Sequence, residues 1–354
     1  MSVIMRREIK NFLKRPLFWL GVLIVVLGVF QDVRPYLGIS YVSSDQDLSL
    51  NTPSSITDAD ITDGYVPTKD EDRRKIWEEE VRGNLVSEFE MSREEAEAVI
   101  EEMKGMDIQE ACEHLETTYH YYSAIYAYED TAFHQGTAEE INSYIEDKLE
   151  SHRFSYYFSR KFADFSGLYM GFFATVMLAA LFWQDTRKNT YELLHTKPIR
   201  AGQYVLGKAA GGFCVCLIVL AILNLIFWAA CCIFTKDSGF EVNLMDFLAA
   251  TALYILPNML MIVCVYSLIS LLFKNPLPAV PLLILYMVYS NTGSRNAEGV
   301  YGYYGRPLAI MVRFPGRFFD TAEPPMVLLN QSFLILASAA ILLICTLLWK
   351  RRRM

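Results

Sequence analysis

The stretch that decides the fold runs from Ala209 to Phe234 and reads AAGGFCVCLIVLAILNLIFWAACCIF. It contains no charged residue, and Asn224 is its one amide side chain. A transmembrane helix needs about 20 mostly apolar residues, because a helix advances about 1.5 Å per residue through a hydrocarbon core about 30 Å thick. The stretch therefore predicts a helix that spans a membrane.

Stretches of the same character lie on both sides of it. The chain of 354 residues is 53% apolar and 20% charged, whereas soluble domains are about 45–50% apolar and about 25% charged. The first apolar run, Leu17–Phe30, also has the form of a signal peptide, but no small-residue cleavage site follows it, so we interpret it as a retained helix. Pro276, Pro278 and Pro281 predict an irregular start for the fifth stretch. The pattern predicts an all-α polytopic membrane protein with six transmembrane helices, at residues 16–40, 161–183, 209–234, 244–273, 277–290 and 326–349.

One block of the chain is strongly acidic. Residues 41–160 hold 29 Asp and Glu against 10 Lys and Arg, whereas the remaining residues hold 11 acidic and 22 basic residues. Ser92 with Glu95, and Thr137 with Glu140, have the spacing of a capping box that begins a helix. The block predicts a helical domain inserted between the first two spans. This division excludes a single soluble domain and disfavours a nucleic-acid partner, because no basic surface belongs to a soluble part.

The short loops carry the charge bias that sets orientation in membranes. Residues 1–15, 184–208, 274–276 and 350–354 together contain 15 basic and 3 acidic residues. Because cytoplasmic loops are rich in Lys and Arg, these segments are predicted to be cytoplasmic, as are both termini. Residues 41–160 and 291–325 are then extracytoplasmic. Residues 1–15 mix apolar and basic positions and predict an amphipathic helix at the lipid surface, with its basic residues at Arg6, Arg7, Lys10, Lys14 and Arg15.

The inner loop between the second and third spans has more structure than a simple connection needs. Residues 184–200 read QDTRKNTYELLHTKPIR. Tyr191, Leu193 and Leu194 form an apolar group flanked by charge, and Pro198 ends the helical pattern. The pattern predicts a short amphipathic helix on which a cytoplasmic protein docks.

This loop resembles the segment after the second span in the permeases of ABC-2-type ABC transporters. The likeness extends to Tyr204-Val205-Leu206-Gly207-Lys208, to Tyr254-Ile255-Leu256-Pro257 and to Arg313-Phe314-Pro315-Gly316. In that family the segment includes the coupling helix, which seats in a cleft of the ATPase subunit. The acidic insert is similar to that of members with an external domain after the first span. The resemblance implies coupling residues at Asp185, Arg187, Thr190, Tyr191, Glu192, Leu193, Leu194, Thr196, Lys197 and Pro198.

The resemblance also implies the partners and the cellular setting. Separate nucleotide-binding subunits would bind ATP and Mg²⁺, and a second permease copy or a paralogue would complete the pathway in a bacterial plasma membrane. The sequence agrees, because it lacks the Gly-x-x-x-x-Gly-Lys-Ser/Thr motif. We therefore expect a protein that is not an enzyme and has no cofactor, metal site or catalytic residue of its own.

The spans contain few candidates for a transport pathway. No strongly charged residue lies in the middle of any predicted span, which disfavours ion-coupled transport. Asn224, Pro257 and Asn258 are the mid-span candidates; Asn224 is better suited to hydrogen bonding with a neighbouring helix than to substrate contact, and Pro257 with Asn258 suits a hinge or the lining of a pathway. This weakly polar path favours an amphipathic cargo, namely a peptide, drug or lipid-like molecule, and the resemblance implies its export.

Two other functional classes compete with transport. A membrane-anchored sensor would detect a ligand with the acidic domain, but it needs a cytoplasmic partner, because the longest inner segment has only about 25 residues. A polytopic membrane enzyme would need a catalytic set, which the sequence does not display.

Overall fold

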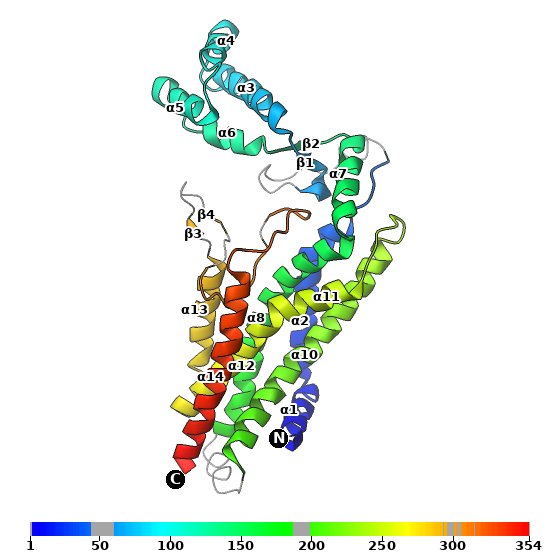
Figure 1. The fold of residues 1–354 in the computed structure, drawn as a ribbon, viewed down its shortest axis with the longest axis vertical. Coiled ribbons are helices and arrows are strands. Elements are labelled where there is room, and N and C mark those ends of the chain that lie inside the picture. Colours follow the sequence, from blue (N-terminus) through cyan, green and yellow to red (C-terminus); the bar gives the residue numbers. More distant parts are fainter. Residues whose placement is uncertain are drawn as a thin grey trace. The chain divides into compact units, whose positions relative to one another are not determined.

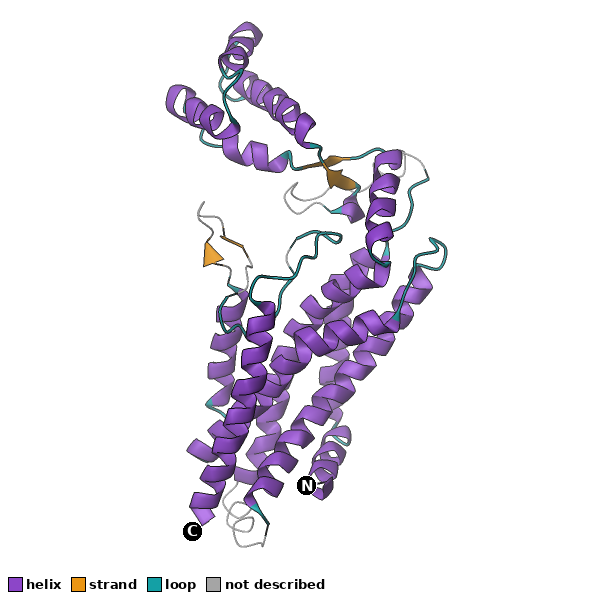
Figure 2. Cartoon of the chain, viewed as in Figure 1, coloured by secondary structure: helices purple, strands orange, loops and turns teal. Residues whose placement is uncertain are grey.

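The computed structural model describes residues 2–43, 60–186, 199–292, 294–295, 301–302, 306–314 and 316–353. The chain divides into two compact units, which we call the bundle unit (Met1–Ile39 and Leu149–Met354) and the inserted unit (Ser40–Lys148). Helices dominate both units, and the strands among the described residues are two to three residues long (Figure 2).

The bundle unit is built from long apolar helices (Figure 1). Its elements are α1 (Ser2–Leu13), α2 (Pro16–Leu37), α8 (Phe154–Thr186), α10 (Ala201–Phe234), α11 (Leu244–Ala250), the π-helix η4 (Thr251–Ile255), α12 (Leu256–Phe273), α13 (Ala279–Asn291), β3 (Ser294–Arg295), β4 (Tyr301–Gly302) and α14 (Val327–Arg353).

Five helices of the described part are long and apolar enough to cross a membrane. They are Pro16–Leu37, Phe154–Ala180, Ala201–Phe234, Leu244–Phe273 and Val327–Arg351. The predicted span 277–290 is the 13-residue helix α13, which at about 1.5 Å per residue is about 20 Å long. The chain is an all-α polytopic membrane protein, and a sixth complete crossing remains a prediction.

Several helices extend beyond the predicted spans. α8 begins at Phe154 rather than at residue 161, and α10 begins at Ala201 rather than at residue 209. The predicted spans end where charged residues begin. In the structure, Lys208 of α10 forms an ion pair with Glu8 of α1, so α10 continues through this charged position. The predicted inner loop 184–208 therefore contains the last turn of α8 and the first two turns of α10.

The core of the bundle unit is aromatic where α8 meets its neighbours. The ring of Phe162 lies 5.2 Å from that of Phe227 on α10 and 5.6 Å from that of Phe247 on α11. α8 also packs against α2 and α12, α12 packs against α14, and α1 packs against α10. α8 is thus the central helix of the unit, which explains why most of its apolar span is buried.

The inserted unit has its own hydrophobic core. Its elements are η3 (Ile61–Asp63), β1 (Tyr65–Pro67), α3 (Asp70–Ser87), α4 (Arg93–Glu102), α5 (Ile108–Tyr119), α6 (Ala124–Asp130), β2 (Phe133–Gln135) and the greater part of α7 (Ala138–Ser151). β1 and β2 are antiparallel, with Val66 opposite His134. Trp77 is fully buried, and its indole N–H donates to the carbonyl of Ala124 at 2.9 Å.

Both predicted capping boxes are confirmed. The Ser92 hydroxyl accepts from the N–H of Glu95, whose carboxylate accepts from the N–H of Ser92. Thr137 and Glu140 exchange the same two bonds before α7. A third box, Asp107 with Glu110, begins α5, and its sequence signal is the Asp-x-x-Glu spacing. The compact unit ends at Lys148, within α7, and residues 154–160, which the sequence places in the acidic block, belong to α8.

Candidate functional site

The predicted docking loop falls largely outside the described residues. Asp185 lies in the last turn of α8, which ends at Thr186. The other nine coupling residues, namely Arg187, Thr190, Tyr191, Glu192, Leu193, Leu194, Thr196, Lys197 and Pro198, lie in 187–198, which the structure does not describe. The site is therefore built from the elements on either side of this loop.

The chain resumes after the loop at a firmly packed point. Tyr204 in the first turn of α10 stacks on Trp349 of α14, with ring centroids 3.9 Å apart and an interplanar angle of 22°. Val205, Leu271 of α12 and Cys345 of α14 complete this buried cluster, with Ile4 of α1, among others, packed against it. We call this side of the bundle unit the terminal end, because Figure 1 shows both chain ends there. Three long helices and α1 are thus tied together next to the docking loop.

A buried ion pair joins α1 to α10 at the same end. Nζ of Lys208 lies 3.1 Å from Oε1 of Glu8, and the two side chains are 3% and 9% exposed. Gly211 allows this approach, since a Cβ there would lie 2.9 Å from the Cβ of Glu8. The ammonium group also lies 5.6 Å from the ring centroid of Phe182 on α8. The pair fixes α1 to the helix that follows the docking loop.

The opposite face of α1 is basic. Arg6, Arg7 and Lys10 are exposed, whereas Phe12 is buried on the side of the bundle. The helix ends at Leu13 rather than at residue 15, so the exposed Lys14 and the half-buried Arg15 lie in the connection to α2. This division into a buried face and a basic exposed face is the pattern of a helix that lies along a lipid surface.

Asn224 and Asn258 lie inside the bundle unit. The amide of Asn224 donates to the Thr251 hydroxyl at 2.9 Å and to the carbonyl of Leu220 at 2.7 Å. Asn224 is 2% exposed and joins α10 to η4 by hydrogen bonding, which is compatible with the alternative that the sequence offers, and its part in a pathway stays a prediction. The amide of Asn258 donates to the carbonyl of Tyr254 at 2.6 Å. Its Oδ1 is buried without a hydrogen-bond partner among the described residues.

Pro257 lies at an irregular point of the fourth span. The π-helix η4 immediately precedes it, and the N–H of Leu256 donates to the carbonyl of Thr251, five residues earlier. Proline has no N–H and cannot complete the α-helical ladder, and π-turns of this kind often occur at functional sites. Pro257 is buried. The fourth span is thus irregular immediately before Pro257, and the place of Pro257 in a transport pathway stays a prediction.

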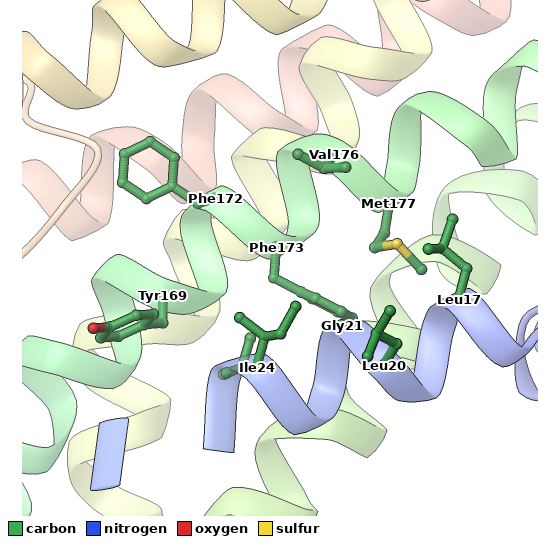
Figure 3. A pocket seen from close by; sticks show the side chains of 10 residues that line it. Leu17, Leu20, Gly21, Ile24, Tyr169, Phe172, Phe173, Val176 and Met177 are labelled. Atoms are coloured by element: carbon green, nitrogen blue, oxygen red, sulfur yellow. The ribbon is translucent and has the colours of Figure 1, made fainter. Parts of the chain in front are cut away.

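An apolar groove lies between α2 and α8 (Figure 3). Its volume is about 300 Å³, and its lining includes Leu17, Leu20, Ile24, Phe172 and Val176. These side chains are all more than two-fifths exposed, so the groove opens to the outside of the bundle unit.

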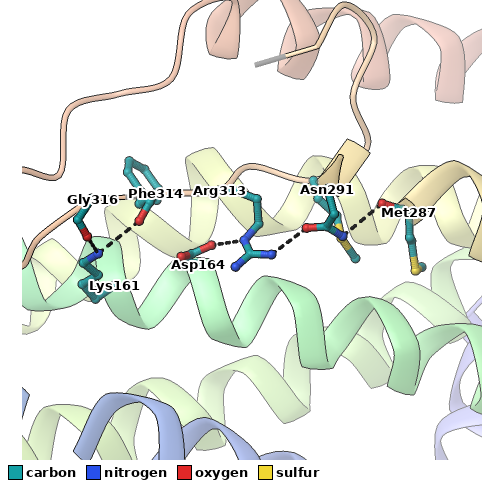
Figure 4. Close-up of polar contacts among 8 residues, drawn as sticks. Lys161, Asp164, Met287, Asn291, Arg313, Phe314 and Gly316 are labelled. Atoms are coloured by element: carbon teal, nitrogen blue, oxygen red, sulfur yellow. Dashed lines mark hydrogen bonds and ion pairs between the residues drawn. The ribbon is translucent and has the colours of Figure 1, made fainter. Parts of the chain in front are cut away.

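A polar cluster at the other end of the bundle unit was missed by sequence reasoning (Figure 4). Arg313 bonds to the carboxylate of Asp164 on α8 and, at 2.6 Å, to Oδ1 of Asn291 on α13. Lys161 donates to the carbonyls of Phe314, at 3.2 Å, and Gly316. The signal was available, because Asp164 stands at the start of a predicted span and Arg313 begins a segment that carries the family likeness. The cluster fastens the segment after β4 to α8.

No group of three or more His, Cys, Asp and Glu residues is placed to hold a metal ion within the described part of the chain.

No curated protein and no solved structure matches the chain. The family profile described as ABC-2 family transporter protein matches residues 2–298, which is most of the sequence. The chain therefore belongs to the ABC-2 family of transporter proteins.

Proposed function

We propose that this chain is the permease subunit of an exporter, and that its ATPase subunit docks on residues 184–198. Proteins of this family are the membrane component of an ABC transporter and work with an ABC ATPase. The observation that carries the proposal is the matched family together with the amphipathic loop that leaves the terminal end of the bundle unit. ATP and Mg²⁺ are bound by the partner, and this chain supplies no catalytic group.

The packing around the loop supports its role in coupling. A movement applied to residues 187–198 reaches the Tyr204–Trp349 stack and the Glu8–Lys208 pair within the first turns of α10. Because packed interfaces switch between discrete arrangements rather than deform continuously, such a push moves α10 as a unit with α1 and α14. The π-turn before Pro257 is a suitable place for the fourth span to bend in response.

The buried polar groups support an amphipathic cargo. Asn224 and Thr251 bond to each other, whereas Oδ1 of Asn258 is a buried acceptor without a partner among the described residues, and none of the three side chains carries a charge. Such surroundings suit a peptide, drug or lipid-like molecule with a modest polar part, whereas an ion would remain unpaired. The pathway itself is proposed to form between two copies of this chain, or between this chain and a paralogue.

Co-purification of the ATPase tests the proposal. The full chain, affinity-tagged, is purified from its native membrane in a mild detergent, and ATPase turnover and the proteins that come with it are measured. Leu194→Asp places a charge in the apolar docking group, and Glu192→Ala removes one of the three acidic residues of the cytoplasmic segments. Both variants are expected to release the ATPase or to lower its turnover at least tenfold. The matched controls Ile76→Asp and Glu94→Ala change exposed residues of the inserted unit and are expected to retain it.

Two results contradict the proposal. If no ATPase accompanies the wild-type chain, or if the two loop variants retain it as well as their controls do, residues 184–198 are not the docking element. The inserted unit then becomes the place to look for function, as the sensor alternative requires.

A further inference from the structure

We propose that the groove between α2 and α8 binds one acyl chain of an anionic phospholipid, with the headgroup held by Lys14 and Arg15. The site lies outside the proposed ATPase contact and does not depend on the identity of the cargo. Its ligand is a membrane lipid of the leaflet on the side of α1.

The dimensions of the groove fit an acyl chain of a single leaflet. The lining residues of α2 extend from Leu17 to Val25, which is about 12 Å of helix at about 1.5 Å per residue. Half of a hydrocarbon core about 30 Å thick is about 15 Å. The facing residues of α8, from Tyr169 to Met177, run alongside this part of α2 (Figure 3). The groove therefore begins at the terminal end of the bundle unit and stops near the middle of the membrane.

The walls of the groove are suited to a flexible chain rather than to another helix. Close helix pairs in membranes use several small residues, which allow the backbones to approach. Here Gly21 is the one glycine among the ten lining residues, and the ring of Phe173 already covers it, because a Cβ at Gly21 would lie 2.8 Å from that ring. The rim is formed by the large, exposed side chains of Leu20, Ile24 and Val176. They leave a narrow apolar slot.

Two basic residues lie in the chain just before the first lining residue of the groove. Arg15 is the residue immediately before α2, with its guanidinium carbon 5.6 Å from the ring centroid of Phe12, and Lys14 precedes it, three residues from the first lining residue, Leu17. Trp19 is 46% exposed and donates its indole N–H to the carbonyl of Leu13 at 2.9 Å. Indole rings of this kind concentrate at the membrane–water interface. A basic cluster next to the cytoplasmic end of a transmembrane helix attracts anionic lipids. The basic residues therefore select an anionic headgroup, and the apolar groove accepts the acyl chain of the same lipid.

Native mass spectrometry of the full chain tests the site. The purified protein is exchanged into detergent that contains equal amounts of phosphatidylglycerol and phosphatidylcholine with the same acyl chains, and the retained lipid is identified. We expect phosphatidylglycerol to be retained about 30-fold better, since each basic residue near the surface contributes about fivefold. Lys14→Gln with Arg15→Gln should abolish this preference. The matched control, Arg153→Gln with Lys236→Gln, removes two basic residues at the other end of the bundle unit and should leave it unchanged.

A second pair of variants tests the slot itself. Ile24→Trp fills the groove with an indole and should remove the retained lipid, whereas Ile226→Trp makes the same change on an exposed apolar position of α10 outside the groove. Equal retention of the two lipids by the wild type overturns the proposal. So does lipid retention that survives Ile24→Trp. If Ile24→Trp instead dissociates a dimer of the chain with no loss of bound lipid, the groove belongs to a second copy.

Discussion

The buried pair of Glu8 and Lys208 offers the sharpest test of the structure, because it joins the N-terminal helix to the third span. Lys208→Met leaves a carboxylate in a place where its side chain is only 9% exposed. Glu8→Gln leaves the ammonium group at the same depth. Each single change should destabilise the bundle unit, whereas the double change removes both charges and should cost much less.

The expected size follows from the geometry. At the observed separation of 3.1 Å, two unit charges attract by about 5 kcal/mol for an effective dielectric constant of about 20. Desolvation offsets part of this attraction, but removing one partner of a buried pair still costs about 3–5 kcal/mol, because the other charge stays buried. For a large domain a loss of about 3 kcal/mol lowers the unfolding midpoint by about 6–12 °C. We expect the double variant to recover at least half of that loss.

Thermal unfolding of the full chain in detergent provides the measurement. Such unfolding is usually irreversible, so the midpoints are compared at one scan rate. Lys236→Met and Glu241→Gln make the same substitutions at exposed positions and should shift the midpoint by less than about 2 °C, which is the usual range for surface changes. If Lys208→Met and Glu8→Gln shift it no more than these controls, or if the double variant equals the sum of the singles, the pair does not join α1 to α10.

Three further predictions concern other parts of the chain. Trp77→Ala should lower the free energy of unfolding of the inserted unit by about 3–5 kcal/mol. Hydrogen exchange should then show that α3 loses protection while α12 keeps it, whereas Tyr122→Ala, which removes an exposed ring, should leave α3 protected. Hydrogen bonds from the backbone N–H groups of Ser92 and Thr137 lower the pKa of Glu95 and Glu140. A lowered carboxyl pKa stabilises the fold above the unfolded pKa of about 4.3, and this stabilisation is lost as the pH falls. The unfolding midpoint of the inserted unit should therefore decrease below about pH 5, and less steeply in Glu95→Gln with Glu140→Gln, which removes the two titrating carboxyl groups. Asn224→Leu and Thr251→Val should each lower the free energy of unfolding by about 1 kcal/mol, and the double variant should lose less than the sum of the two. An additive loss, or a change in cargo-stimulated ATPase turnover, would place Asn224 in the pathway instead.

Much of the fold follows from local signals in the sequence. The long apolar runs predict α2, α10, α12 and α14, because a membrane imposes one length and one composition on every crossing. The capping boxes at Ser92 and Thr137 predict the starts of two helices of the inserted unit to the residue, since the bonds involved join residues only three apart. The insertion itself follows from the acidic block, whose charge no membrane span would carry.

The remainder depends on contacts between residues far apart in the chain. The sequence pattern places Lys208 at the end of an inner loop. In the structure, Lys208 is buried and pairs with Glu8, which lies 200 residues earlier in the chain. Asp164 and Arg313 likewise pair across 149 residues, so neither is recognisable as part of a cluster from its neighbours alone. The role of Asn224 was left open for the same reason, because Thr251 is its partner only once α10 and η4 are packed.

The shortness of α13 has a consequence for the membrane around the protein. A helix about 20 Å long meets a hydrocarbon core about 30 Å thick with a hydrophobic mismatch of about 10 Å. The chain after β4 fills part of this gap: Tyr286 and Tyr289 donate to the carbonyls of Leu308 and Pro307, and the hydroxyl of Ser290 accepts from the N–H of Ile310. Non-helical backbone at such a depth persists only where protein or water satisfies it. Where α13 faces lipid, its apolar length is therefore about two-thirds of the usual hydrocarbon thickness, and the mismatch is met by these protein contacts or by a locally thinner bilayer.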